Sequence, residues 1–149
     1  MTIAETVNAA ITDAMRKREP ARLSALRMLK AAFMNREAEK GRALRDDEAQ
    51  QVVSSLVKQR KDSVEQFLKG GRTDLAAKET AEMAVLQAYL PPAADPAAVE
   101  QAVVEAIAET GAASPKEMGR VMKAVMEKLA GQNVDGKTVN ELVRRKLAS

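Results

Sequence analysis

Apolar side chains recur every three or four residues along this sequence, and proline and glycine interrupt the pattern at intervals. The first run places Ile3, Val7, Ile11 and Met15 one above another on a single helical face. Proline lacks a backbone N–H and clashes with the preceding turn, so it suits only helix ends, and all five prolines lie at such points. The sequence therefore predicts an all-α fold.

The start and stop signals divide the 149 residues into seven expected helices, and the 2% aromatic content argues against strands. Acidic residues 46–48 stand at the start of one helix, where the helix dipole favours them. The first five helices are expected over about residues 2–18, 20–41, 46–69, 73–90 and 95–111. The sixth is expected to begin at Ser114, and the seventh is expected over residues 135–147. Because Pro91-Pro92 forbids continuation, we expect a bundle of about four helices over residues 1–92 and a three-helix module over residues 93–149.

The chain has no cysteine and no histidine, which excludes disulfides, thiolate nucleophiles, imidazole catalysis and the usual zinc sites. We therefore expect no catalytic residue, no metal site and no cofactor. No apolar run approaches the roughly 20 residues of a membrane span, and the first residues do not resemble a signal peptide. We expect a cytoplasmic protein that does not bind membranes, and we make no prediction of its oligomeric state.

Residues 131–138 match G-x-x-x-x-G-K-[ST], the pattern of nucleotide-binding P-loops. A P-loop needs a buried strand leading into it, so that consecutive backbone N–H groups can surround a phosphate. Residues 121–130 have helical periodicity instead, which favours a simple connection between two helices. A nucleotide-hydrolysing enzyme is therefore the weaker interpretation of this motif.

Two expected helices each carry a charged residue within their apolar face. If Gly70-Gly71 folds these helices into an antiparallel hairpin, residue 60 lies level with about residue 81, so Arg60 should meet Glu79 or Glu82. Our hypothesis is a buried or half-buried structural ion pair that fixes the register of the hairpin. The alternative is that these side chains extend to water.

Charge is distributed unevenly near the C-terminus, because residues 93–113 carry four acidic and no basic side chains, whereas residues 114–149 carry eight basic and four acidic ones. Six cations project from the side opposite the apolar stripes of the last two expected helices, namely Lys116, Arg120, Lys123, Lys137, Arg144 and Arg145. We predict that they form one exposed surface that contacts RNA phosphates. The alternative is an ordinary solvated face, because no aromatic residues alternate with the charges.

Several longer motifs resemble one known family. Residues 58–67 read KQRKDSVEQF, residues 70–82 read GGRxDLAxKExxE, and YLP follows at 89–91. Later, MGxVM covers residues 118–122 and DGKxVN covers residues 135–140. Together these motifs, over residues 2–148, are similar to the YqeY (GatB/YqeY) family.

This resemblance implies a helical bundle followed by a three-helix module, and kinship with the tail of the GatB component of the tRNA-dependent amidotransferase. That enzyme, a carbon–nitrogen ligase with glutamine as amido-N-donor, converts mischarged Glu-tRNA or Asp-tRNA to the amide. Its tail helps to hold tRNA, and the glutaminase and kinase chemistry lies in other domains, which these 149 residues do not contain.

The resemblance thus implies a non-catalytic protein that binds tRNA or assists tRNA-dependent amidation. The expected partners are tRNA and the amidotransferase or another translation component. A protein-interaction adaptor, which docks through the acidic fifth helix or the first bundle and has no nucleic-acid role, is the alternative.

Overall fold

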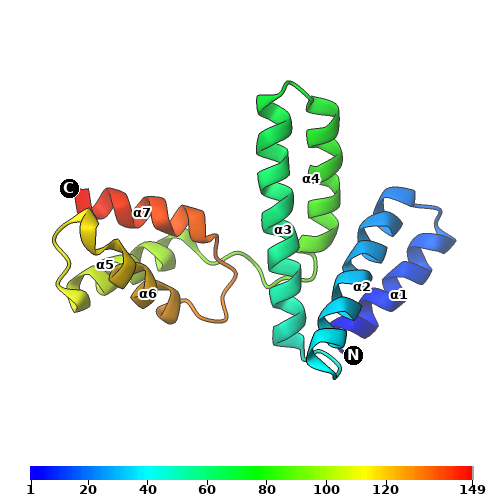
Figure 1. The fold of residues 1–149 in the computed structure, drawn as a ribbon, viewed down its shortest axis with the longest axis horizontal. Coiled ribbons are helices and arrows are strands. Elements are labelled where there is room, and N and C mark those ends of the chain that lie inside the picture. Colours follow the sequence, from blue (N-terminus) through cyan, green and yellow to red (C-terminus); the bar gives the residue numbers. More distant parts are fainter. Residues whose placement is uncertain (149) are drawn as a thin grey trace. The chain divides into compact units, whose positions relative to one another are not determined.

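The computed structural model describes residues 1–148, and the predicted all-α fold is confirmed over that range (Figure 1). The described helices are α1 Ile3–Arg16, α2 Pro20–Lys40, α3 Asp46–Lys69, α4 Thr73–Gln87, α5 Pro96–Thr110, the short 3-10 helix η1 Pro115–Glu117, α6 Met118–Lys128 and α7 Gly136–Ala148. The chain divides into two compact units, one covering residues 1–90 and one beginning at Pro91. We call them the N-terminal and C-terminal units.

Most helix ends lie where side-chain caps and glycines predict them. Thr2 and Glu5 form a reciprocal capping box at α1, in which each side chain accepts from the other's backbone N–H, at 3.2 and 3.1 Å. Asp95 caps α5 by accepting from the Ala97 N–H at 3.0 Å. These local contacts satisfy backbone donors that have no partner within the helix.

Three boundaries differ from the prediction. Helix α4 ends at Gln87 instead of about residue 90, because the Tyr89 and Leu90 N–H groups bond carbonyls three residues back, at 3.1 Å each. The first helix ends at Arg16 instead of about residue 18, because Arg18 takes a left-handed conformation with φ of 54°. The start signal at Ser114 produces a 3-10 turn before α6, because the Glu117 N–H bonds the Ser114 carbonyl three residues back, at 3.1 Å.

The N-terminal unit packs α1 to α4 around one apolar core, and α3 and α4 form an antiparallel hairpin (Figure 1). Its largest fully buried side chains are Val7, Leu26, Leu29, Val53 and Leu86. Burial of one such side chain contributes roughly 1.5–3 kcal/mol, so these contacts are the main source of stability in the unit.

The C-terminal unit has a separate core between α5, α6 and α7. Val103, Val121, Val125, Val139 and Val143 are at most 1% exposed there. Valine is short and branched at Cβ, so it fills a small core with little loss of side-chain entropy.

The segment that joins the two units is bonded into the C-terminal unit. The Ala94 N–H donates to the Asn133 carbonyl at 2.9 Å, and Asn133 Nδ2 donates to the Pro91 carbonyl at 2.8 Å. Ala93 and Asn133 also form an isolated parallel bridge. These bonds fix residues 91–94 against the connection between α6 and α7.

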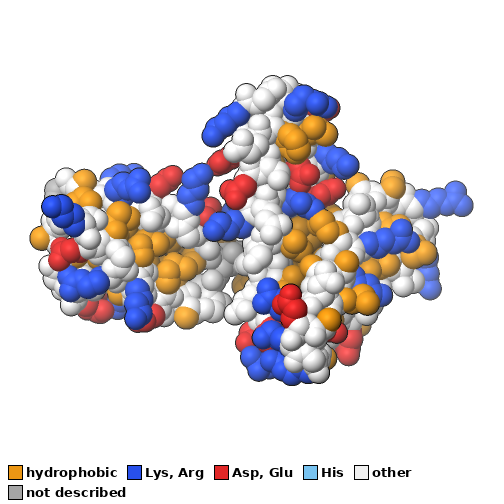
Figure 2. Space-filling model, in the orientation of Figure 1, with side chains coloured by type: hydrophobic (Ala, Val, Ile, Leu, Met, Phe, Trp, Pro, Cys, Tyr) orange, Lys and Arg blue, Asp and Glu red, His pale blue; other side chains and the backbone are white. Residues whose placement is uncertain are grey.

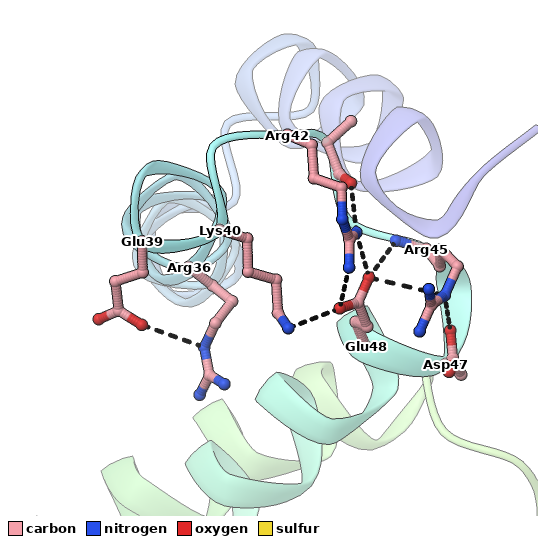
Figure 3. Close-up of polar contacts among 8 residues, drawn as sticks. Arg36, Glu39, Lys40, Arg42, Arg45, Asp47 and Glu48 are labelled. Atoms are coloured by element: carbon pink, nitrogen blue, oxygen red, sulfur yellow. Dashed lines mark hydrogen bonds and ion pairs between the residues drawn. The ribbon is translucent and has the colours of Figure 1, made fainter.

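A buried carboxylate organises the corner between α2 and α3 (Figure 3). Glu48 is 5% exposed, the one buried charged side chain among residues 1–148. It accepts two hydrogen bonds from Arg42, at 2.7 and 2.9 Å, one from the Arg45 N–H at 3.0 Å, and pairs with Lys40 at 2.8 Å. Hydrogen bonds from Arg42, then Lys40 and the Arg45 N–H, hold the pKa of Glu48 far below its ordinary value.

The hairpin of α3 and α4 contains a second charged cluster. Arg60 Nε lies 3.1 Å from Glu79 Oε2 and 3.2 Å from Glu82 Oε2, and these side chains are 12–19% exposed. The guanidinium also contacts Met28 Sδ on α2. Arg60 Nε and Glu79 Oε2 are buried without a well-aligned hydrogen bond to any described residue, so their contact is an ion pair. Arg60, Glu79 and Glu82 thus lie together in the structure, at the positions where the expected register of the hairpin placed them side by side.

We predict that replacing Glu48 with glutamine destabilises the protein at neutral pH. A carboxyl whose pKa is lowered by folding stabilises the fold above its unfolded pKa of about 4.3, and this contribution is lost as the pH falls through the folded pKa. The unfolding free energies of wild type and Glu48→Gln in urea should therefore differ by a constant amount between about pH 6 and pH 7, and the difference should shrink progressively as the pH falls below about 4. The control is Glu127→Gln, at an exposed glutamate. If the unfolding free energies of wild type and Glu48→Gln differed by the same amount at every pH, the buried carboxylate would not be the cause of the destabilisation.

We also predict that Arg60→Ala costs about 2–4 kcal/mol of unfolding free energy, because it leaves two mostly buried carboxylates without their counter-ion. Adding Glu79→Gln and Glu82→Gln to Arg60→Ala should recover most of the lost unfolding free energy, because the neutral amides need no counter-ion. Denaturant unfolding measures both variants. A loss of less than about 0.5 kcal/mol for Arg60→Ala would mean that the cluster behaves like a surface ion pair.

Candidate nucleic-acid interface

The six predicted phosphate-binding cations are all exposed side chains of the C-terminal unit. Their positions are Lys116 on η1, Arg120 and Lys123 on α6, and Lys137, Arg144 and Arg145 on α7. Buried valines on the same helices, such as Val121 and Val143, fix the opposite faces against the core. The five cations of α6 and α7 are therefore held on helices whose inner faces are packed, whereas η1, which carries Lys116, has no buried residue.

Spacing along each helix groups some of these cations. Arg120 and Lys123 are three residues apart on α6, and Lys137 and Arg144 are seven apart on α7, so each pair lies on one side of its helix. Figure 2 shows lysine and arginine side chains spread over the visible face of the C-terminal unit, at the left, with hydrophobic side chains between them. That all six cations form one continuous surface stays a prediction.

The two basic side chains of this region outside the predicted set are paired with acids of α5. Lys128 Nζ lies 2.7 Å from Glu109 and 3.7 Å from Glu105, and Lys146 Nζ lies 2.9 Å from Glu100. The Glu109 hydrogen bond raises the pKa of Lys128, and the Lys146 hydrogen bond lowers the pKa of Glu100. The acidic helix is thus engaged by α6 and α7 of its own unit.

Weaker contacts involve members of the predicted set. Arg120 Nη2 lies 2.9 Å from Glu117 Oε1, with 60% of the arginine side chain exposed. Backbone N–H groups of Ala113 and Ser114 also bond Glu117 and lower its pKa. Arg144 reaches Asn140 Oδ1 only at 3.5 Å. Because an exposed ion pair contributes at most about 1 kcal/mol, a phosphate can replace Glu117 as the partner of Arg120.

The P-loop-like segment connects two helices. It follows α6, turns at Gly131 with φ of 80°, and ends where Asp135 Oδ1 accepts from the Lys137 N–H at 3.1 Å. Over residues 1–148 no strand leads into the turn, and the extended pairing there is the single bridge between Ala93 and Asn133. The strand that a P-loop requires is replaced by α6.

A cleft of about 610 Å³ lies beside this connection, within the C-terminal unit. Its walls come from α5, α7, residues 93–94 and residues 133–135. Sequence reasoning missed it, because Asn133 is a single polar residue in a turn and nothing local indicates that it bonds Pro91, 42 residues away.

The remaining predicted residues lie elsewhere. Arg60, Glu79 and Glu82 belong to the hairpin of the N-terminal unit.

No group of three or more acidic residues that could hold a metal ion occurs among the described residues. Across residues 1–148 no helix has both the length and the apolar character needed to cross a membrane.

Comparison with known proteins places the sequence in a family. The profile of the Yqey-like protein family matches residues 4–147. The protein named "Altered inheritance of mitochondria protein 41, mitochondrial" from Saccharomyces cerevisiae (strain YJM789) is 35% identical over 81 residues, or 54% of this chain and 44% of that protein. Proteins of the same name show 35% identity over 54% of this chain and 44% of theirs in Eremothecium gossypii, and 33% over 54% and 43% in Lachancea thermotolerans.

The aligned segment therefore spans less than half of each of these relatives. The family profile, in contrast, covers both units and nearly all of the sequence. This chain belongs to the YqeY family.

Proposed function

We propose that this protein binds tRNA through the exposed cations of η1, α6 and α7, and that it assists tRNA-dependent amidation without a catalytic site of its own. The observation that carries the proposal is how charge is divided within the C-terminal unit. The glutamates of α5 pair with Lys128 and Lys146, and the six predicted cations are exposed side chains, five of them on the packed helices α6 and α7. Spaced cations on a rigid frame are what a nucleic-acid backbone requires.

The chain belongs to the YqeY family, and the link to amidation rests on the kinship with the amidotransferase tail that the resemblance implies. The ligase chemistry of that enzyme would reside in its other domains, so we assign this chain a role in holding tRNA. The name of the yeast relatives places them in mitochondria. We propose the cytoplasm for this chain, although tRNA occurs in both compartments and the binding proposal depends on neither.

An adaptor that docks proteins through acidic α5 or through the bundle of the N-terminal unit is the competing function. At α5, Glu100, Glu105 and Glu109 already pair with lysines of the same unit, through exposed contacts that contribute at most about 1 kcal/mol each. A basic partner would have to displace those lysines first. The salt dependence of the binding affinity distinguishes the two functions, because affinity for phosphates falls steeply as the salt concentration rises, whereas apolar docking responds little.

We predict that the triple variant Arg120→Ala, Arg144→Ala, Arg145→Ala binds tRNA at least about ten-fold more weakly than wild type near 100 mM salt. Each lost phosphate contact should also lower the slope of log affinity against log salt by about 0.7–0.9, or roughly 2–3 in total. Fluorescence anisotropy titrations at several salt concentrations measure both quantities.

The matched control carries Lys58→Ala, Lys69→Ala and Lys78→Ala, which removes three exposed cations from the hairpin of the N-terminal unit. It should bind tRNA within about two-fold of wild type. Circular dichroism verifies that both triple variants remain folded. Unchanged tRNA binding by the folded arginine variant would remove the site assignment.

A further inference from the structure

The cleft of the C-terminal unit lies between two of its helices. Its walls come from α5 and from the stretch of α7 between Thr138 and Arg145, and residues 93–94 and 133–135 complete the lining. Because a helix rises about 1.5 Å per residue, that stretch of α7 is about 10 Å long, or roughly two turns. The volume of about 610 Å³ lies within the usual range of roughly 300–1,000 Å³ for binding sites, so the cleft can hold several side chains of a partner.

The apolar part of the lining is an uncovered edge of the core. Val99, Val134 and Leu142 pack against the buried valines of the unit, yet all three are only half-buried. An apolar groove beside packed helices is a surface on which another helix docks, through apolar side chains three or four residues apart. Since four residues of helix span about 6 Å, two such side chains fit along the α7 wall.

Charge limits what can occupy the cleft. The charged side chains that line it are three carboxylates and one cation, with a formal sum of −2, namely Glu100, Asp135, Glu141 and Arg145. Lys146 borders the adjoining recess and pairs with Glu100 at 2.9 Å, and counting it leaves a sum of −1. A negative lining favours a cationic occupant and disfavours a phosphate.

Glu141 is the carboxylate of the lining that a partner can reach most directly. Its side chain is exposed on α7, and it forms no hydrogen bond or ion pair with another residue in the range 1–148. Glu100, in contrast, is held by Lys146, and Asp135 accepts from the Lys137 N–H at 3.1 Å. A lysine or arginine of a partner can therefore pair with Glu141 without displacing a cation from it.

We propose that this cleft docks a basic amphipathic helix of a partner protein, with two apolar side chains between α5 and α7 and a lysine or arginine beside Glu141. The apolar contacts supply most of the affinity, and Glu141 supplies the preference for a cation, because charge complementarity gives specificity more than affinity. The inference does not rest on tRNA binding. Arg120 and Arg144 do not line the cleft, so a docked helix leaves both of them exposed.

The test uses the full chain to select binders from a displayed library of random peptides of about 16 residues, long enough for four helical turns. The enriched peptides should share two apolar residues three or four apart and at least one lysine or arginine close to them. Ala93→Trp fills the cleft from an exposed lining position and should weaken binding of the enriched peptide at least about ten-fold. Fluorescence anisotropy measures the affinity, and circular dichroism verifies that the variant is folded.

A charge reversal tests the role of Glu141 separately from the shape of the cleft. Glu141→Lys should weaken the peptide enriched on wild type at least about five-fold, and a selection on this variant should enrich aspartate or glutamate in place of the cation. The matched control is Glu127→Lys, at an exposed glutamate of α6 that does not line the cleft, which should bind within about two-fold of wild type.

Three results would overturn the inference: no enrichment, enriched peptides without a cation, or binding that Ala93→Trp and Glu141→Lys leave unchanged. Two more would assign the cleft to another occupant. One is a wild-type dimer, seen by light scattering, that Ala93→Trp converts to a monomer, which would indicate a second copy of this chain. The other is loss of tRNA binding in Ala93→Trp, which would indicate RNA. Failure of tRNA binding in wild type would instead remove the proposed function and leave the docking result standing.

Discussion

The protein is built around two separate apolar cores, one in each unit. The C-terminal unit has a core made largely of valines, and small domains bury a lower fraction of their surface than large ones. Contacts outside that core therefore matter: the lysines of α6 and α7 pair with α5, and Asn133 bonds the entering chain. These contacts leave the outward cations of α6 and α7 exposed on a fixed frame.

Local signals predicted much of this fold. Prolines, glycines and capping residues act within one turn of helix, so the bounds of α2 and α3 follow from residues that are close in sequence. The approach of Arg60 to Glu79 and Glu82 also followed, because a hairpin of known turn position has a calculable register. The apolar face of α3 is not buried along its whole length, since Val53 is buried while Phe67, near the hairpin tip, is half-buried.

Features that depend on distant residues could not be predicted. Acidic residues 46–48 suited a helix start, yet nothing local distinguished Glu48, which Arg42 and Lys40 reach only because α2 and α3 turn sharply at this corner (Figure 3). The cleft depends in the same way on a bond between Asn133 and Pro91. The six cations were recognised as exposed from periodicity alone, but their arrangement around the unit depends on how α6 packs against α7.

We infer that tRNA contacts the C-terminal unit through η1, α6 and α7. Hydroxyl-radical footprinting of the full chain, free and saturated with tRNA, tests it most directly by measuring which side chains lose solvent access. We expect protection within residues 114–148 and none along the α3–α4 hairpin, residues 46–87. Protection confined to the hairpin, with residues 114–148 unchanged, would contradict it.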